Sequence, residues 1–171
     1  MPVIFLLLCL SLTAFAKVEV HALEKKKVTI DVPENWESVK DLFGLPLTVL
    51  GPWENSARPA MSFLYTGMEE KKFPKSEMEK LFTTYKSDKK EWTEAKEGKL
   101  LSLDLLTPVK MGSNSGYFVG SEFEINNLHF IERSYYIACG GFFYNIKYSI
   151  RKSQQKYISD LEKIIGSFKC D

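Results

Sequence analysis

The chain has few of the residues from which catalytic and metal sites are usually built. Its 171 residues include two histidines, His21 and His129, and three cysteines. A zinc site needs three or four ligands at suitable spacing, and these scattered residues do not provide them. The sequence also lacks nucleotide-binding glycine loops, GxSxG and HExxH motifs and a CxxC pair. We therefore expect no enzyme activity, no catalytic residue, no metal and no cofactor.

The chain also has no excess of charge of either sign. Lysine and arginine number 23, aspartate and glutamate number 22, and the net charge is +1. A protein that binds nucleic acid through its phosphates needs a basic face, so this balance argues against a nucleic-acid partner. The 44 % of hydrophobic and 13 % of aromatic residues indicate instead a globular, sheet-rich domain.

The first 16 residues predict an export signal. They form an apolar run that ends in Ala14-Phe15-Ala16, just before the first charged residue, Lys17. A small-x-small ending after a short apolar core is typical of a signal-peptidase site, whereas a spanning helix needs about 20 apolar residues. We expect cleavage after Ala16, no membrane span afterwards, and one domain over residues 17–171 in the periplasm or outside the cell. The run has no lysine or arginine near its N-terminus, where a signal peptide usually carries positive charge. An uncleaved membrane tether is therefore the alternative.

Two cysteines, Cys139 and Cys170, belong to the predicted mature domain, since Cys9 leaves with the signal. An even number of cysteines in an exported protein is compatible with a disulfide. The alternative is one buried thiol and one thiol at a frayed terminus.

Hydrophobic periodicity indicates a mixture of strands and helices. Ser76 and Glu79 have the spacing of a capping box before the first helix, and Ser153 is a candidate cap for the second. Met78, Leu81, Phe82, Tyr85 and Trp92 form the apolar stripe of the first helix. The expected helices cover residues 77–96 and 154–168, and the expected strands cover 18–23, 27–32, 47–50, 60–65, 100–109, 117–125, 128–138 and 142–150.

The last three strands form a meander with two tight hairpins, at 126–127 and 140–141. Two-residue turns of Asn-Asn and Gly-Gly tolerate the positive φ that such hairpins require. They place Phe123 opposite Phe130 on one face and Tyr135 opposite Ile146 on the other. Both faces are thus apolar and need a cover. The predicted fold class is α+β, a three-layer α/β/α sandwich with a mainly antiparallel central sheet and a C-terminal helix.

Three segments resemble the PsbP-like superfamily, which also takes in the Ran-binding Mog proteins and bacterial relatives of the DcrB type. They are residues 28–36 (Val-Thr-Ile-Asp-Val-Pro-Glu-Asn-Trp), residues 140–148 (Gly-Gly-Phe-Phe-Tyr-Asn-Ile-Lys-Tyr) and the closing pattern Tyr157-x3-Leu161-x3-Ile165-Gly-Ser-Phe. The resemblance spans nearly all of residues 27–168 and implies a three-layer fold with a non-catalytic binding or accessory role. It implies no ligand, because members bind unrelated partners. The chain has no plastid transit peptide, so no photosynthetic role or metal site is carried over.

Segment 43–53 is the predicted partner-binding region. Glycines and prolines interrupt it, so part of it should lie outside the sheet ladder. Large apolar side chains on a rigid loop can form a docking patch for another protein. The candidate contact residues are Phe43, Leu45, Leu50 and Trp53. The alternative is that the segment is an edge strand whose side chains enter the core.

The polar residues of the hairpins predict surface pairs rather than a site. His129 faces Glu124 across the first hairpin, and Arg133 lies diagonal to Glu122. We expect a surface His–carboxylate pair in the first case and an ion pair in the second. His21, in the leading segment, is expected to be exposed.

Together these features predict an exported, non-catalytic binding or accessory protein of the cell envelope or extracellular space that acts through contact with another protein. An accessory factor and a toxin-neutralising immunity protein both fit this description. A carrier of an apolar or lipid ligand is one alternative, and it would have an enclosed apolar cavity between a helix and the sheet. A hydrolase with a non-standard site is another, and it would have a pocket with convergent ionisable groups.

Overall fold

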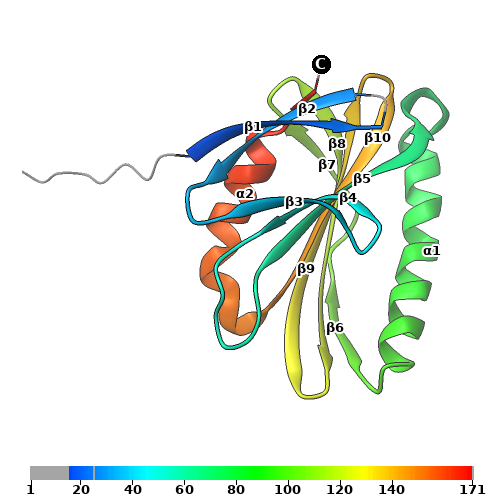
Figure 1. Cartoon of the computed structure of the whole chain (residues 1–171). Coiled ribbons are helices and arrows are strands. Elements are labelled where there is room, and N and C mark those ends of the chain that lie inside the picture. The colour runs from blue at the N-terminus through cyan, green and yellow to red at the C-terminus, as the bar shows by residue number, and fades with distance from the viewer. Residues whose placement is uncertain (1–15, 25, 171) are drawn as a thin grey trace, which may run out of the picture.

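The computed structural model describes residues 16–24 and 26–170 (Figure 1). The predicted signal lies outside these residues except for Ala16, which begins the first strand. No helix in the described part of the chain is long and apolar enough to cross a membrane. The helices are α1 (Lys75–Glu94) and α2 (Ile158–Ser167), with 3-10 turns η1 (Glu70–Lys72) and η2 (Lys152–Tyr157) just before them. The strands are β1 (Ala16–Leu23), β2 (Lys26–Pro33), β3 (Glu37–Leu42), β4 (Leu45–Leu50), β5 (Ala60–Glu69), β6 (Lys99–Leu103), β7 (Thr107–Met111), β8 (Asn114–Ile125), β9 (Leu128–Cys139), β10 (Phe142–Arg151) and β11 (Lys169–Cys170).

The strands form one large sheet and one small sheet. The large sheet has the order β3-β4-β5-β10-β9-β8-β6, and β7 pairs with another part of β8. The small sheet has the order β1-β2-β11. All of these pairings are antiparallel, which confirms the predicted mainly antiparallel sheet.

The meander β8-β9-β10 has the predicted registers. Asn126 and Asn127 have φ of 53° and 61°, and Gly140 and Gly141 have φ of 58° and 84°. These left-handed conformations permit two-residue hairpins whose twist matches that of the strands. Phe123 lies opposite Phe130, and Tyr135 lies opposite Ile146, as expected.

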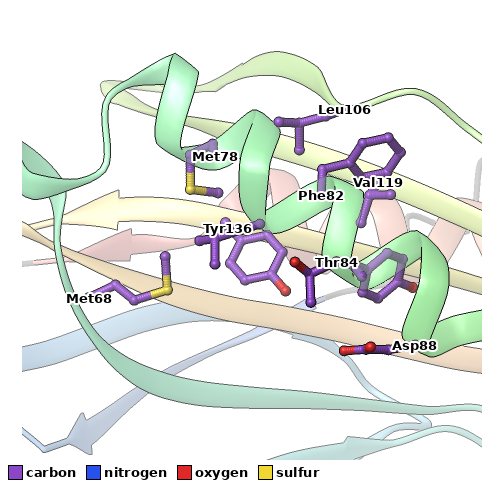
Figure 2. A pocket seen from close by; sticks show the side chains of 10 residues that line it. Met68, Met78, Phe82, Thr84, Asp88, Leu106, Val119 and Tyr136 are labelled. Atoms are coloured by element: carbon purple, nitrogen blue, oxygen red, sulfur yellow. The ribbon is translucent and has the colours of Figure 1, made fainter.

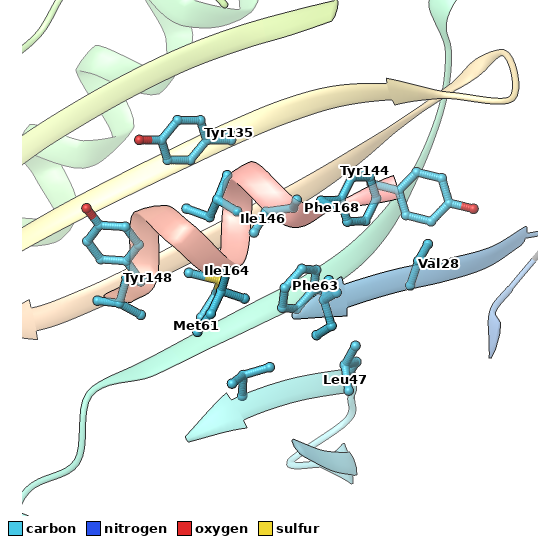
Figure 3. Packing of buried hydrophobic residues seen from close by; sticks show 14 of the residues in the cluster. Val28, Leu47, Met61, Phe63, Tyr135, Tyr144, Ile146, Tyr148, Ile164 and Phe168 are labelled. Atoms are coloured by element: carbon cyan, nitrogen blue, oxygen red, sulfur yellow. The ribbon is translucent and has the colours of Figure 1, made fainter. Parts of the chain in front are cut away.

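One face of the large sheet contains the main hydrophobic core. Its buried side chains meet those of α2 and of β2 (Figure 3). Phe63 of β5 stacks with Phe168 at a centroid distance of 6.2 Å, and the Tyr148 hydroxyl donates a hydrogen bond to Glu162 of α2 at 2.6 Å. Trp36 is buried in the same core. The C-terminal helix therefore packs on this face of the sheet through its buried apolar residues, Leu161, Ile164 and Ile165.

The opposite face carries α1, and the two helices lie on different sides of the strands (Figure 1). Trp92 of α1 meets Phe123 of β8 edge to face, with 5.5 Å between ring centroids, and Met78 is buried. On the first face, however, α2 shares the cover with the small sheet. The expected antiparallel sheet and C-terminal helix are confirmed, whereas the three-layer order stays a prediction.

Both helices begin differently from the prediction. The residue before α1 is Pro74, whose extended backbone leads straight into the helix at Lys75, so Ser76 lies in the first turn and caps nothing. The second helical segment begins as the 3-10 turn η2, and at its start the side-chain oxygen of the buried Gln154 accepts a hydrogen bond from the backbone N–H of Arg151 at 3.3 Å. Ser153 is therefore not the cap.

Three strand predictions also change. Residues 100–109 form two strands rather than one. The ladder of β6 with β8 ends at Leu103, the N–H of Asp104 still bonds to the carbonyl oxygen of Gly120 at 2.8 Å, and pairing with β8 resumes at Thr107. Two further strands, β3 and β11, were not expected because neither has an apolar alternation long enough to detect. β11 carries Cys170, which forms a disulfide with Cys139 at the end of β9. Their Cα atoms are 6.0 Å apart, within the roughly 4.4–6.8 Å that disulfides span.

Candidate functional site

The predicted docking segment 43–53 contributes one strand and two exposed tips. Its central part is β4, which lies between β3 and β5 and is therefore an internal strand, not an edge. Leu47 and Val49 of β4 are buried in the core, and Leu45 and Leu50 are half-buried. Phe43 occupies the β3–β4 turn with φ of 52° and is 95 % exposed. The segment therefore has features of both the predicted docking loop and its alternative: the side chains within the strand enter the core, and exposed apolar side chains lie at its two ends.

Trp53 lies in the loop between β4 and β5 and is 72 % exposed. The guanidinium of Arg58 lies over its ring, with 5.5 Å from Cζ to the ring centroid. The same guanidinium donates hydrogen bonds to the carbonyl oxygens of Gly51 and Leu50. It also forms an ion pair with Glu37 of β3. Arg58 therefore ties the loop to two strands while it supports the indole ring.

The rest of this loop is also held in place. Glu54 and Ala57 exchange backbone hydrogen bonds of 2.8 and 3.0 Å. The Glu54 carboxylate forms an ion pair with Lys156 of η2 at 2.9 Å, and this hydrogen bond raises the pKa of Lys156. An exposed aromatic side chain on a braced loop loses little conformational entropy when a partner binds.

The four predicted contact residues do not form one patch. Phe43 and Leu45 lie at one end of β4, whereas Leu50 and Trp53 lie at the other. A six-residue strand is about 20 Å long, so one compact contact cannot cover both ends. The exposed apolar residues therefore form two separate surfaces, one at Phe43 and one at Trp53. Of these, the Trp53 loop is held by more hydrogen bonds and ion pairs.

A pocket of about 260 Å³ lies between α1 and the large sheet (Figure 2). Leu81, Thr84 and Asp88 are exposed residues of α1, so the pocket opens to solvent along the helix. Met68 of β5 and Leu106 of the β6–β7 connection also line it. The lining is mostly apolar and consists of Met68, Met78, Leu81, Phe82, Thr84, Tyr85, Asp88, Leu106, Val119 and Tyr136.

A buried cluster of charges adjoins this pocket. Glu132 of β9 is 4 % exposed and accepts hydrogen bonds from Lys89 at 2.9 Å and from the Tyr85 hydroxyl at 3.0 Å. Lys147 of β10 forms a further ion pair with it at 3.1 Å. The ammonium of Lys89, 7 % exposed, also lies 4.0 Å from the ring centroid of Phe123. Tyr85 lines the pocket as well, so the apolar and charged regions are continuous.

Burial and pairing shift the ionisation of this cluster in definite directions. Burial disfavours the carboxylate of Glu132, but the ammonium groups of Lys147 and Lys89 outweigh it and hold the pKa of Glu132 below its usual value. Burial lowers the pKa of Lys89, and pairing with Glu132 offsets this only in part. Burial and the neighbouring carboxylate both raise the pKa of Tyr85. Because both Glu132 oxygens are bonded to donors, this is the arrangement of a structural ion cluster rather than of a free general base.

The predicted surface pairs need correction. The imidazole Nε2 of His129 lies 2.7 Å from a carboxylate oxygen of Glu122 rather than pairing with Glu124, and the ammonium of Lys152 also approaches Glu122, at 3.3 Å. The pKa of Glu122 is lowered because the hydrogen bonds from His129 and Lys152 outweigh its burial.

Arg133 pairs with Asp104 at 3.4 Å, not with Glu122. It lies opposite Gly120, where the missing side chain leaves room for Asp104 to reach the guanidinium.

The expectation that His21 is exposed is wrong. Its position on β1 points inward, where it is buried and its Nε2 lies 3.0 Å from a carboxylate oxygen of Glu19. In the described part of the chain, no three His, Cys, Asp or Glu side chains gather in a way that could hold a metal ion.

The charged cluster was missed at the sequence level, although two signals point to it. Lys89 lies on the apolar stripe of α1, between Tyr85 and Trp92 at helical spacing. Glu132 lies on the row of β9 that alternates with core positions and that also contains Phe130 and Tyr136. A charged residue on an apolar row indicates a buried charge, but the pattern does not show which residue pairs with it.

Comparison with known proteins identifies the fold but no sequence family. No protein-family model and no curated protein sequence matches the chain. The solution structure of the cyanobacterial PsbP protein (CyanoP) of Synechocystis sp. PCC 6803 superposes with a TM-score of 0.60, covering 93 % of this chain and 95 % of the other at 11 % identity. The fold is PsbP-like. The crystal structure of LpqN of Mycobacterium tuberculosis, a protein involved in cell envelope biogenesis, matches with a TM-score of 0.52 over 91 % of each chain, also at 11 % identity. At this identity the PsbP-like likeness concerns the fold alone.

Proposed function

We propose that this protein is an exported, non-catalytic accessory protein of the periplasm or extracellular space that binds another protein through the Trp53 loop. The disulfide between Cys139 and Cys170 supports export, since such bonds persist in oxidising compartments. LpqN, with the same fold, is involved in cell envelope biogenesis, which supports a role in the envelope. In this proposal α1 and α2 are the outer layers of an α/β/α sandwich around the large sheet.

The observation that carries the proposal is the exposed indole of Trp53 on a loop that Arg58 and Glu54 hold in place. Trp and Arg are the residues most enriched at the centres of protein interfaces. A pre-formed loop presents them without the entropic cost of ordering it. Phe43 and Leu45, at the other end of β4, form a second and smaller contact in a partner that extends along the strand.

The test is affinity capture from the native envelope with wild-type protein and the variant Trp53→Ala. Loss of a central aromatic contact costs about 2 kcal/mol or more of binding free energy, so the affinity for the partner should fall roughly 30-fold. Less of the partner should then be recovered. Leu128→Ala is the matched control, because Leu128 is also an exposed apolar side chain but lies at the β8–β9 hairpin. Equal recovery of the same partner by Trp53→Ala and by the wild type would contradict the proposal.

A second candidate function, binding of an apolar ligand, is favoured by the pocket under α1. It lies between a helix and the sheet, where a carrier would hold its ligand. Its volume of about 260 Å³ is below the roughly 300–1,000 Å³ of typical ligand sites, and it is open rather than enclosed. The pocket therefore suits a short acyl chain or one ring system better than a whole lipid.

Two adjacent threonines of α1 allow a matched test of this pocket. Thr83 and Thr84 are both exposed, and each hydroxyl donates to the carbonyl oxygen four residues earlier. Thr84 lines the pocket, and Thr83 does not. Thr84→Trp should abolish the fluorescence gain of 8-anilinonaphthalene-1-sulfonate, whereas Thr83→Trp should keep it. A wild type that gives no fluorescence gain, or equal gains in both variants, would argue against a ligand site.

A further inference from the structure

Among the described residues, strand β1 is an edge of the small sheet with no strand paired on its outer side. It pairs with β2 through eight consecutive residues without a bulge, and β2 pairs on its other side with β11. Val18 and Val20 face outward and are 65 % and 61 % exposed. An edge strand presents unpaired backbone N–H and C=O groups, which can pair with a further strand.

The other sheet edges in the described chain carry features that oppose such pairing. On one side of the large sheet, β6 has a register shift between Leu100 and Ser102, and β7 contains Pro108. On its other side, β3 bears Glu37, Lys40 and Asp41. In the small sheet, β11 has only two residues. Short strands, bulges, proline and charge are the usual means of protecting an edge. β1 is eight residues long, has no bulge and no proline, and its two charged side chains, Lys17 and Glu19, pair with each other at 2.8 Å.

We propose that β1 is the interface for a second copy of this chain, paired antiparallel across a two-fold axis at Val20. The two small sheets then form one continuous six-stranded sheet. A two-fold axis requires the same patch on both subunits, so the strand must be complementary to itself. This inference rests on β1 and is independent of the Trp53 loop.

The side chains of β1 select this register. With the axis at Val20, this residue faces the partner's Val20, and Val18 faces the partner's Ala22 on the same outer face. On the inner face, Glu19 then faces the partner's His21, which suits a carboxylate and an imidazole. With the axis at Glu19, two carboxylates would be directly opposite, which destabilises a strand pair.

Cysteine cross-linking tests both the pairing and its register. Val20→Cys places two thiols directly across the axis, within the Cα distance that a disulfide needs. Val18→Cys places them four residues apart along the strands, about 13 Å, which is too far. Under mild oxidation we expect a covalent dimer from Val20→Cys and little from Val18→Cys. The opposite yields, or no dimer from either variant, would overturn the proposal.

Sedimentation equilibrium of the protein without added cysteines is the second measurement. The wild type should associate to a dimer as its concentration rises. Val20→Lys should weaken this dimer about tenfold or more, because two ammonium groups would then face each other in place of an apolar pair. Thr29→Lys is the matched control, since Thr29 lies beside Val20 on the neighbouring strand β2. A wild type that stays monomeric at all concentrations, or equal effects of the two substitutions, would overturn the proposal.

Discussion

Replacement of Glu132 by leucine is expected to lower the free energy of unfolding by about 3–5 kcal/mol, because it leaves a buried ammonium without its counter-charge. Lys89 is 7 % exposed and lies against the rings of Trp92 and Phe123, whereas the side chain of Lys147 is 40 % exposed. The variant also removes the acceptor of the Tyr85 hydroxyl. Urea unfolding of the variant and the wild type, followed by tryptophan fluorescence, measures the difference.

The double variant Lys89→Met with Glu132→Leu separates the missing counter-charge from the loss of the pair itself. Apolar residues of similar size often replace a buried ion pair at no net cost. We expect the double variant to recover most of the loss and to unfold within about 1 kcal/mol of the wild type. A double variant as unstable as Glu132→Leu alone would mean that the cluster contributes through its hydrogen bonds and shape rather than through charge balance.

The effect of Glu132 should depend on pH in a definite direction. Its folded-state pKa is lowered, so the ionised carboxylate contributes stability that is fully present above the unfolded-state pKa of about 4.3. This contribution decreases as the pH falls through the lower folded-state pKa. The stability difference between wild type and Glu132→Gln should therefore be largest near neutral pH and decrease in acid. A difference that is constant from neutral pH into the acid range would contradict this account.

The closing meander could be predicted in detail from the sequence because its information is local. A two-residue Asn-Asn or Gly-Gly turn fixes the register of a hairpin, and the register decides which side chains share a face. Phe130 and Ile146 were thus placed on opposite faces without knowledge of the rest of the chain. The helical spacing of Tyr157, Leu161 and Ile165 is equally local. These elements contain most of the core.

The sites that depend on contacts between distant segments could not be predicted in the same way. Glu132 and Lys89 meet only because α1 packs on β9 and β10 at one particular position along these strands, and no local sequence pattern sets that position. The pocket above Tyr136 depends on the same placement. Arg58 braces the Trp53 loop through a carboxylate of β3, a strand whose sequence gave no periodic signal. Segment 43–53 was singled out correctly as broken and apolar, but the length of β4 separates its two tips.

Loss of the disulfide between Cys139 and Cys170 is expected to destabilise the protein by about 3–4 kcal/mol. The bond closes a loop with a sequence separation of 31, and the chain-entropy model gives this magnitude for such a loop. The bond also attaches β11 to the end of β9, while β11 pairs with β2 through only two residues. Reduction should therefore release the C-terminal strand first and expose part of the core around Val28.

Urea unfolding with and without reductant measures this contribution, and the double variant Cys139→Ala with Cys170→Ala provides the control. The reduced wild type and the double variant should unfold at similar, lower urea concentrations, and reductant should not change the variant. Hydrogen exchange should increase most at residues 169–170 and at the β2 positions they pair with. If reductant leaves the unfolding midpoint of the wild type unchanged, the two cysteines do not cross-link the folded chain in solution, and the main physical support for an oxidising compartment is lost.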